Sequence, residues 1–509
     1  VTSEEEVAVL RREAQMGVTV IFATLPQSSV IREYRDLREL LGIRAVIADE
    51  IPLAGMHLFS GFLLGGEEIY EVTEPAEEER QDMNPSVPWY TTGAGTKTYM
   101  VGTLSDETIE QTVDDEIRAQ YVGMDEEAAK NSLLPAILWR NSVDTAKIFC
   151  VNGDYLADIS AVGILDAMMG ETYDYDIYPV INAQNLVIAD LPTFVSENEE
   201  EMQKRYSQSA QAVYQEIVWP SLTSIASRTG AKMTCMMTPQ FTYTDEEEPD
   251  GENVTYYLKR LKEEHAEAGL SADSREGILL SEKIKQDQTF WQTYAPSYRF
   301  LSLYTDGVKS IGEESALPAE IRTVALGSGA SEAVGYLNEN VTLQPSTSSG
   351  IRHTFLDDFK VKCMETALGY SNITLDLYSV TYPEGDEDSW EKMSKKIAAN
   401  LGTYWKAYEA FDATTLTESD VRIRRFLALD YKQQRAGNVI TLSLEHREDA
   451  AWFLLRLHGE KVTEVAGGSF EEIEDGVYLI LAEEDEVSVE VQNGETWQYQ
   501  DGGKCGDGT

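Results

Sequence analysis

Cysteine, histidine and basic residues are all scarce in this chain. Its 509 residues include 4 cysteines and 5 histidines, and 41 Lys and Arg against 89 Asp and Glu leave a net charge of −48. Cysteines this few and far apart form neither a CxxC zinc pair nor a redox dithiol. An acidic surface repels nucleic acid and anionic membranes, and no apolar run reaches the ~18 residues of a membrane helix. A neutral or cationic partner fits better.

Strong catalytic motifs are also missing from the sequence. The histidines are isolated, so neither HxxxH nor HExxH occurs, and a three-histidine zinc site is excluded. No GxSxG elbow is present, and no GxGxxG loop follows a strand-like run. Any active site must therefore be built from carboxylates, amides and single histidines.

Enough apolar and aromatic residues are present for a globular fold. Hydrophobic residues make up 42% of the chain, with 26 Tyr and 8 Trp, and at roughly 150 residues per domain the length suits about three domains. The sequence opens at Val1 on a helix followed by a strand, which is typical of the middle of a domain. We expect an export signal or anchor to lie ahead of this sequence, and an extracytoplasmic or cell-surface location.

Residues 1–146 read as alternating strands and helices. The run VTVIFATLP (18–26) predicts a strand, residues 32–43 have helical spacing that stops at Gly42, and RAVIAD (44–49) predicts another strand. This α/β order predicts a parallel sheet. The layout resembles the C-terminal half of a flavodoxin-like or class I amidotransferase-like domain, truncated at its N-terminus. Because no Cys stands in a Gly-flanked elbow, we expect a binding or non-catalytic domain.

Two further domains and a tail are expected. Residues 147–436 hold at least six apolar strands interleaved with helices at spacings near 30 residues, which favours a (β/α) barrel. Residues 437–500 show period-two strands and turns, which predict a small antiparallel β-sandwich. The last segment, residues 501–509, is expected to be a disordered tail.

Polar residues directly after the barrel strands are the candidate site residues. Active sites of such barrels lie at the carboxyl ends of the strands, where paired carboxylates do acid–base work and amide and aromatic side chains bind sugars. Asp376 stands out because it lies in an otherwise apolar strand. Asp154 fits either a catalytic acid or the N-cap of the following helix. His353 fits either a ligand or a surface residue at the start of a helix. Three candidates for catalysis are Asp154, Asp376 and His353, and those for substrate binding are Asn152, Asn182, Asp190, Gln240, Tyr243 and Asp306.

Several segments resemble the DUF2194 family of uncharacterised bacterial proteins. They include KIFCVNGDYL, NLVIADLPTF, AKMTCMMTPQF, LQPSTSSGIRHTFLDDF and SNITLDLYSVTYPEGDEDSW, within residues 145–435. The resemblance implies a relationship to the glycoside hydrolase/deacetylase barrels that include the NodB-like polysaccharide deacetylases. In that superfamily an Asp pair after the first strand supplies base and metal ligand, and an HxxxH supplies two more ligands. Here only Asn152-Gly153-Asp154 matches, and the HxxxH is absent.

Two functions therefore stay open. The first is a carbohydrate-active enzyme, a polysaccharide deacetylase or glycoside hydrolase with a site rebuilt from Asp154, His353 and Asp376. The second is a catalytically inactive polysaccharide-binding or scaffold subunit of an exopolysaccharide synthesis and export complex at the membrane. Whether a divalent metal takes part, and which, is left undetermined.

Overall fold

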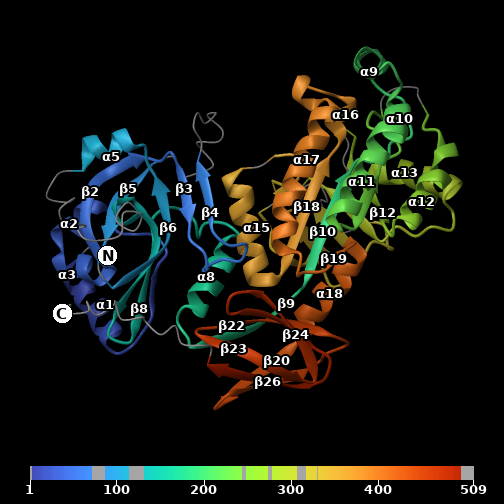
Figure 1. Cartoon of the computed structure of the whole chain (residues 1–509). Coiled ribbons are helices and arrows are strands. Elements are labelled where there is room, and N and C mark those ends of the chain that lie inside the picture. Colours follow the sequence, from blue (N-terminus) through green and yellow to red (C-terminus); the bar gives the residue numbers. More distant parts are fainter. Residues whose placement is uncertain are drawn as a thin grey trace, which may run out of the picture. The chain divides into compact units, whose positions relative to one another are not determined.

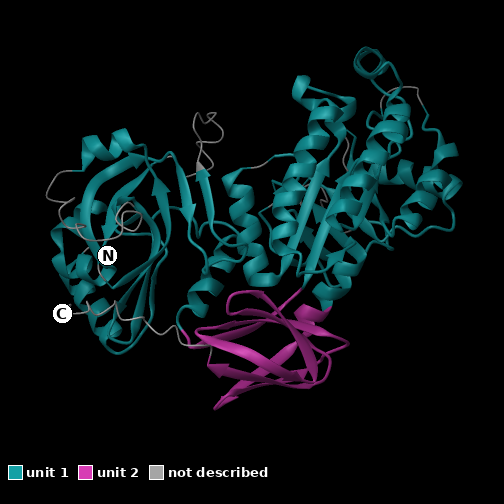
Figure 2. Cartoon of the chain, in the orientation of Figure 1, with its two compact units in different colours: residues 1–172, 182–424 teal, residues 173–181, 425–509 magenta. Residues whose placement is uncertain are grey.

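The computed structural model describes residues 3–71, 86–93, 95–113, 131–243, 248–272, 278–306, 317–329, 331–352 and 354–493. The chain divides into two compact units, shown in Figure 2. Residues 1–172 and 182–424 form the first, and residues 173–181 and 425–509 form the second. No helix of the described ranges is long and apolar enough to cross a membrane. The predicted tail, residues 501–509, lies outside the described residues.

A six-stranded sheet forms the first part of unit 1 (Figure 1). Its strand order is β1 (Val20–Phe22), β8 (Ala146–Val151), β7 (Ala136–Val143), β6 (Thr96–Thr103), β3 (Gly55–Leu58) and β4 (Glu68–Glu71). A separate antiparallel ribbon joins β2 (Ile43–Pro52) to β5 (Ser86–Thr92). The helices of this part are α1 (Glu4–Gln15), α2 (Ser28–Glu33), α3 (Arg35–Leu41), α5 (Asp106–Thr112) and α8 (Ala161–Gly170).

The predicted parallel sheet is wrong for this part of the chain. Among its described strands only β1 and β8 pair in parallel, and the β3–β4, β3–β6, β6–β7 and β7–β8 pairings are antiparallel. A flavodoxin-like arrangement is thereby excluded here. The predicted end of the helix at Gly42 is confirmed. Gly42 follows α3 at φ 71°, a left-handed conformation that glycine adopts without steric cost.

A curled, mostly parallel sheet forms the rest of unit 1. Its order is β15 (Gly335–Tyr336), β16 (Thr342–Pro345), β14 (Thr323–Leu326), β13 (Ser302–Thr305), β12 (Glu267–Ser271), β11 (Met233–Met237), β10 (Ala183–Ala189), β18 (Tyr370–Asp376) and β17 (Ser348–Ser349), with β19 (Ala413–Thr414) beside β10. β16 and β17 lie near opposite ends of this strand order, yet β17 follows β16 almost directly in the chain. The short segment 342–349 therefore pairs with β14 on one side and with β18 on the other. Buried runs such as that of β10 are typical of parallel strands covered on both faces.

Helices flank the curled sheet and extend beyond its edges (Figure 1). They are α9 (Glu199–Tyr206), α10 (Ala210–Val213), α11 (Trp219–Thr229), α12 (Val254–Glu263), α13 (Leu280–Tyr294), α15 (Phe355–Leu368), α16 (Tyr378–Thr381), α17 (Trp390–Tyr404) and α18 (Leu416–Ala428). The N-terminus of α15 is capped by Thr354, whose hydroxyl accepts the Asp357 N–H. α15 also packs against α8, so one apolar core joins the two sheets of unit 1.

The start of α18 fills the amino end of the curled sheet. The Leu416 N–H donates to Thr234 Oγ1 of β11, and Glu267 at the start of β12 accepts the N–H and hydroxyl of Thr417. Leu416 itself packs with Val187, Ala189, Met236, Tyr304 and Ala325 inside the sheet. The interior is therefore closed at this end.

Unit 2 consists of two four-stranded antiparallel sheets around one apolar core. One sheet is β20 (Asp430–Ala436), β21 (Val439–Glu445), β26 (Glu486–Asn493) and β23 (Glu460–Ala466). The other is β24 (Gly468–Glu474), β25 (Val477–Ala482), β22 (Ala451–Leu457) and β9 (Tyr175–Val180).

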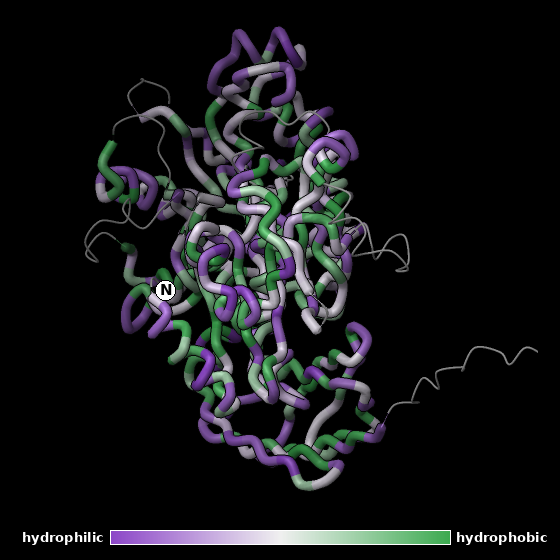
Figure 3. The backbone as a smooth tube through the Cα atoms, turned by 90° about the vertical axis from the view of Figure 1, so that its left-hand side faces the viewer, coloured by the Kyte–Doolittle hydropathy of each residue, from purple (hydrophilic) through white to green (hydrophobic). Residues whose placement is uncertain are grey.

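Figure 3 shows hydrophilic residues along many of the outer segments of the chain, which agrees with its net charge of −48.

Three boundaries differ from those predicted. The barrel was expected to begin at 147, but β8 belongs to the six-stranded sheet. The segment of β9 was assigned to the barrel, whereas it pairs with β22 of unit 2. Unit 2 also begins earlier than 437, because β20 pairs with β21. β9 was misplaced because a strand's sequence does not reveal which distant strand it pairs with. β8 and β20 instead pair with strands next to them in the chain, β7 and β21, so those two errors overlooked local hairpins.

Candidate functional site

Two carboxylates leave neighbouring strands at the carboxyl edge of the curled sheet. Asp376, the last residue of β18, is the register partner of Ala189 in β10, and Asp190 comes next in the chain. Ala189 belongs to the interior cluster, so Asp376 points to that same face. The buried Tyr214 hydroxyl donates to the carbonyl of Leu377, the residue after Asp376, at 3.0 Å. Burial raises the pKa of this phenol, and the charges of Asp190 and Asp376 raise it further.

Asp190 is held firmly in place. Its side chain is buried, its backbone is left-handed at φ 58°, and Ser271 at the end of β12 donates its hydroxyl to Asp190 Oδ1 at 2.5 Å. A non-glycine residue in this conformation is uncommon and persists where the surroundings fix it. Asp376 is half-buried, and its Oδ1 accepts the Tyr378 N–H at 2.9 Å.

A buried polar network extends from this edge to the first turns of α13. Lys283 Nζ donates to the Ser271 carbonyl at 2.9 Å and to Asp287 Oδ2 at 2.5 Å. Tyr243 donates its hydroxyl to Asp287 Oδ1 at 2.7 Å, and Lys283 Nζ lies 5.3 Å from the Tyr243 ring centre. Burial, with the neighbouring Asp287 charge, raises the pKa of Tyr243 far above its ordinary value, so the phenol stays protonated.

Aromatic rings gather beside the two carboxylates. The half-buried Tyr378 and Tyr382 rings stack with centroids 4.8 Å apart, and Phe241 meets Tyr378 edge-on at 5.1 Å. Buried Glu197 accepts the Phe241 N–H at 3.1 Å and the Tyr382 hydroxyl at 3.2 Å. Glu197 thereby fixes the aromatic group against the edge.

A pocket of about 560 Å³ lies between α13 and the loop after β11. Two predicted residues, Gln240 and Tyr243, line it together with Asp287. The structure therefore brings together four predicted residues, because Asp190 and Asp376 belong to the same edge as this network.

Asn152 and Asp154 lie elsewhere. Both follow β8 of the six-stranded sheet, so they do not lie at a strand end of the curled sheet. Asn152 is buried and donates its amide to the carbonyls of Pro88 and Ala136 at 2.9 Å, which is a structural role. Asp154 is exposed in the following turn, where its carbonyl accepts the Ala157 N–H. The predicted union of Asp154 with Asp376 was wrong because β8 was assigned to the wrong sheet.

Asn182 was predicted to follow a barrel strand, but the strand ahead of it, β9, pairs with β22 of unit 2. Asn182 precedes β10, and its side chain bonds Asp412 through the Asp412 N–H and Oδ2, so it anchors the amino edge. Asp306 does follow β13 at the carboxyl edge, where it is exposed and accepts the Tyr304 hydroxyl at 3.1 Å. His353 lies outside the described residues.

Sequence reasoning missed Lys283, Asp287, Ser271 and Glu197. A Lys and an Asp four residues apart on a helix usually form a solvated pair, and that pattern hides a buried one. One signal could have found them. Lys283 and Asp287 share a helical stripe with Ile284, Phe290 and Trp291, the apolar face that α13 buries.

No group of three or more His, Cys, Asp or Glu side chains placed to hold a metal ion occurs within the described ranges. A d-block ion in a protein takes three or four such ligands. The described residues at this edge offer the chemistry of two carboxylates, Asp190 and Asp376.

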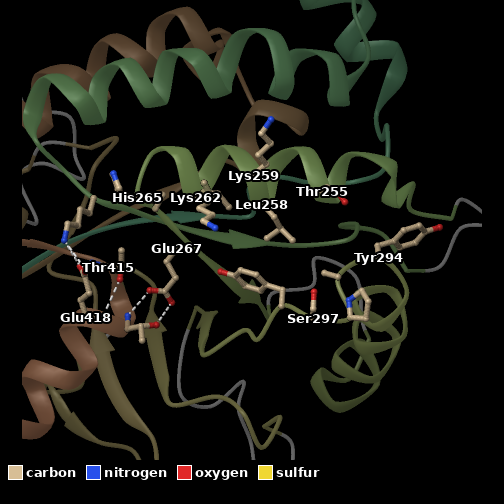
Figure 4. A pocket seen from close by; sticks show the side chains of 17 residues that line it. Thr255, Leu258, Lys259, Lys262, His265, Glu267, Tyr294, Ser297, Thr415 and Glu418 are labelled. Atoms are coloured by element: carbon tan, nitrogen blue, oxygen red, sulfur yellow. Dashed lines mark hydrogen bonds and ion pairs between the residues drawn. The ribbon is translucent and has the colours of Figure 1, made fainter.

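A second pocket, of about 960 Å³, opens at the amino edge (Figure 4). It lies between α12, the end of α13 and the start of α18, and its lining includes Lys262, Tyr294 and Glu267. Glu267 already accepts two hydrogen bonds from Thr417 and one from Ser302, so its role is to hold the start of α18 against the amino end of the sheet. The carboxyl edge is therefore the better candidate for chemistry.

Fold and site together define a mixed α/β protein with a carboxylate pair and aromatic side chains at the carboxyl edge of a curled parallel sheet. Residues 126–276 match the family described as an uncharacterised protein conserved in bacteria (DUF2194), which confirms the resemblance stated from the sequence. No curated protein sequence matches the chain.

Solved structures that resemble the chain are carbohydrate-processing enzymes. The carbohydrate deacetylase Agd3 has 8% identity and a TM-score of 0.46, covering 96% of this chain and 88% of its own. An endo-β1,6-glucanase has 9% identity and a TM-score of 0.26, covering 61% of this chain and 82% of its own. Likenesses this distant carry no argument about activity.

Proposed function

We propose that this chain is a carbohydrate hydrolase whose catalytic carboxylates are Asp190 and Asp376. The observation that carries the proposal is their exit from adjacent parallel strands at the same edge of the sheet. Two carboxylates at one mouth suffice to cleave a glycosidic bond, one as acid on the leaving oxygen and the other as base or nucleophile.

The surroundings of the pair favour a sugar as substrate. The half-buried rings of Tyr378 and Tyr382 lie beside Asp376, backed by the buried Phe241. Amphipathic rings with a few fixed polar groups are what a sugar-binding cleft needs. Asp190, locked by Ser271, is assigned as the base or nucleophile, and the more exposed Asp376 as the acid.

The test is hydrolysis of surface polysaccharides, followed as new reducing ends. Asp190→Asn and Asp376→Asn should each lower the rate by about 10²–10⁴-fold, with unchanged circular dichroism. Asp154→Asn, in the turn after β8, should keep the activity. Full activity in both strand-end variants would overturn the assignment. Release of acetate in place of reducing ends would replace it with deacetylation.

A second candidate function is polysaccharide binding without catalysis. It is favoured by the local bonds that already engage both carboxylates, from Ser271 to Asp190 and from the Tyr378 N–H to Asp376. Such a subunit would serve a polysaccharide export system at the cell surface, as the family resemblance implies. Tight oligosaccharide binding with no hydrolysis by the unaltered chain would decide for it.

A further inference from the structure

We infer that the pocket between α13 and the loop after β11 binds a neutral sugar unit and rejects uronic acid units. The inference rests on the proposed function and names its substrate class. The pocket is linked to Asp190 by one continuous set of contacts, from Tyr243 to Asp287, Lys283 and Ser271.

Neutral amide and hydroxyl groups dominate the polar lining. Gln240 Oε1 is a buried acceptor for which the described residues supply no hydrogen-bond donor. Gln240 as a whole is half-buried and lines the pocket, so it adds a neutral amide to the wall. The exposed Gln286 amide and the Thr289 and Thr293 hydroxyls face the same pocket. The Gln286 amide can both donate to and accept from sugar hydroxyls. The two threonine hydroxyls donate to the helix carbonyls of Lys285 and Thr289, so toward a sugar they act as acceptors.

Two aromatic rings complete the pocket. Phe290 and Tyr294 lie on α13 with centroids 5.0 Å apart, and Tyr294 is 42% exposed. The C–H face of a pyranose ring packs against such surfaces while its hydroxyls reach the polar rim.

The charge of the lining sets the selectivity. Among the described lining residues the carboxylates are Asp287 and the exposed Glu248, and none of these residues is a lysine or arginine. Lys283 neutralises Asp287 from behind but has no exposed surface, so a ligand cannot reach it. A uronate carboxylate would meet negative charge without a cation partner, in a chain with a net charge of −48.

The test measures, by calorimetry, the affinity of the full chain for three neutral oligosaccharides and one acidic one. These are the tetramers of glucose, galactose and N-acetylglucosamine, and trigalacturonate. At least one neutral tetramer should bind, and trigalacturonate should bind at least tenfold more weakly. Gln240→Ala and Gln286→Ala should each weaken neutral binding about two- to tenfold. Gln292→Ala is the matched control, since Gln292 is an exposed glutamine of α13 outside the lining.

A gain of function sharpens the test. Gln286→Lys should bring trigalacturonate binding up at least tenfold, whereas Gln292→Lys should not. Tighter uronate than neutral binding in the unaltered chain, no binding of any probe, or equal effects at positions 286 and 292 would each overturn the inference. Loss of hydrolysis in Asp190→Asn is measured separately, so the proposed function can stand when the pocket assignment fails.

Discussion

The Lys283 ammonium lies 2.5 Å from Asp287 Oδ2, and the Lys283 side chain has no exposed surface. Removing one partner of a buried pair leaves an uncompensated charge. We therefore expect Lys283→Met to lower the free energy of unfolding by about 3–5 kcal/mol, measured by urea denaturation.

An exposed pair with the same spacing is the control. Glu391 and Lys395 are also four residues apart, and both are largely exposed. Lys395→Met should leave the unfolding midpoint unchanged, because solvent screens such pairs. Equal effects of the two substitutions would contradict the burial of Lys283.

Glu365 on α15 makes stability depend on pH. Its side chain is fully buried, and this burial raises its pKa from 4.5 to about 8. The folded chain then holds a proton that the unfolded chain releases. The contribution of Glu365 to the free energy of unfolding is therefore greatest below pH 4.5 and falls as the pH rises to about 8. The decline from this group is roughly 1.4 kcal/mol per pH unit at most.

Glu365→Gln should flatten that part of the pH–stability curve, because glutamine carries no titrating proton. The exposed Glu409→Gln serves as the control and should keep the slope of the unaltered chain. Denaturation curves between pH 5 and 9 in steps of about one unit would show the difference. A slope unchanged by Glu365→Gln would disprove the assignment.

Gly163 allows α8 to approach α15 closely. A Cβ at this position would lie 2.2 Å from the Cys363 carbonyl oxygen. Gly163→Ala should therefore destabilise the chain by about 1–3 kcal/mol. Gly402→Ala in α17, where a Cβ meets nothing within 4 Å, should stabilise by about 0.5–1 kcal/mol. Thermal unfolding of the two variants should shift in opposite directions.

The buried thiols should be unreactive in the folded chain. Cys150, Cys235 and Cys363 are fully buried, and burial raises the pKa of each thiol. Thiolates are the reactive form, so iodoacetamide should modify these three only after unfolding. Peptide mass spectrometry would measure it, and rapid labelling of any of the three under native conditions would contradict their burial.

Local patterns in the sequence predicted elements better than their pairing. The helix stop at Gly42 and the buried run of β10 follow from side-chain size and spacing, which are local properties. β9 was assigned to the wrong sheet because its partner, β22, lies far away in the chain. β8 pairs with a distant strand, β1, and with β7 directly before it, and the prediction overlooked that hairpin.

The candidate site shows the same division. Asp190 and Asp376 were found because each ends an apolar run, and parallel strands bring such ends together. Lys283 was missed because its burial depends on how α13 packs against the sheet, which its charged neighbours in sequence do not reveal.

The chain crosses between its two units more than once, with consequences for any attempt to divide it. β9 lies between α8 and β10 in sequence, yet its hydrogen-bond partner is β22. A protein ending at residue 424 would keep β9 while losing β22, leaving Ile177 without the apolar core that surrounds it. Such a truncated protein would present a bare strand edge prone to aggregation. Each unit is built from two separate stretches of the chain, so truncation at a single position separates neither unit intact from the other.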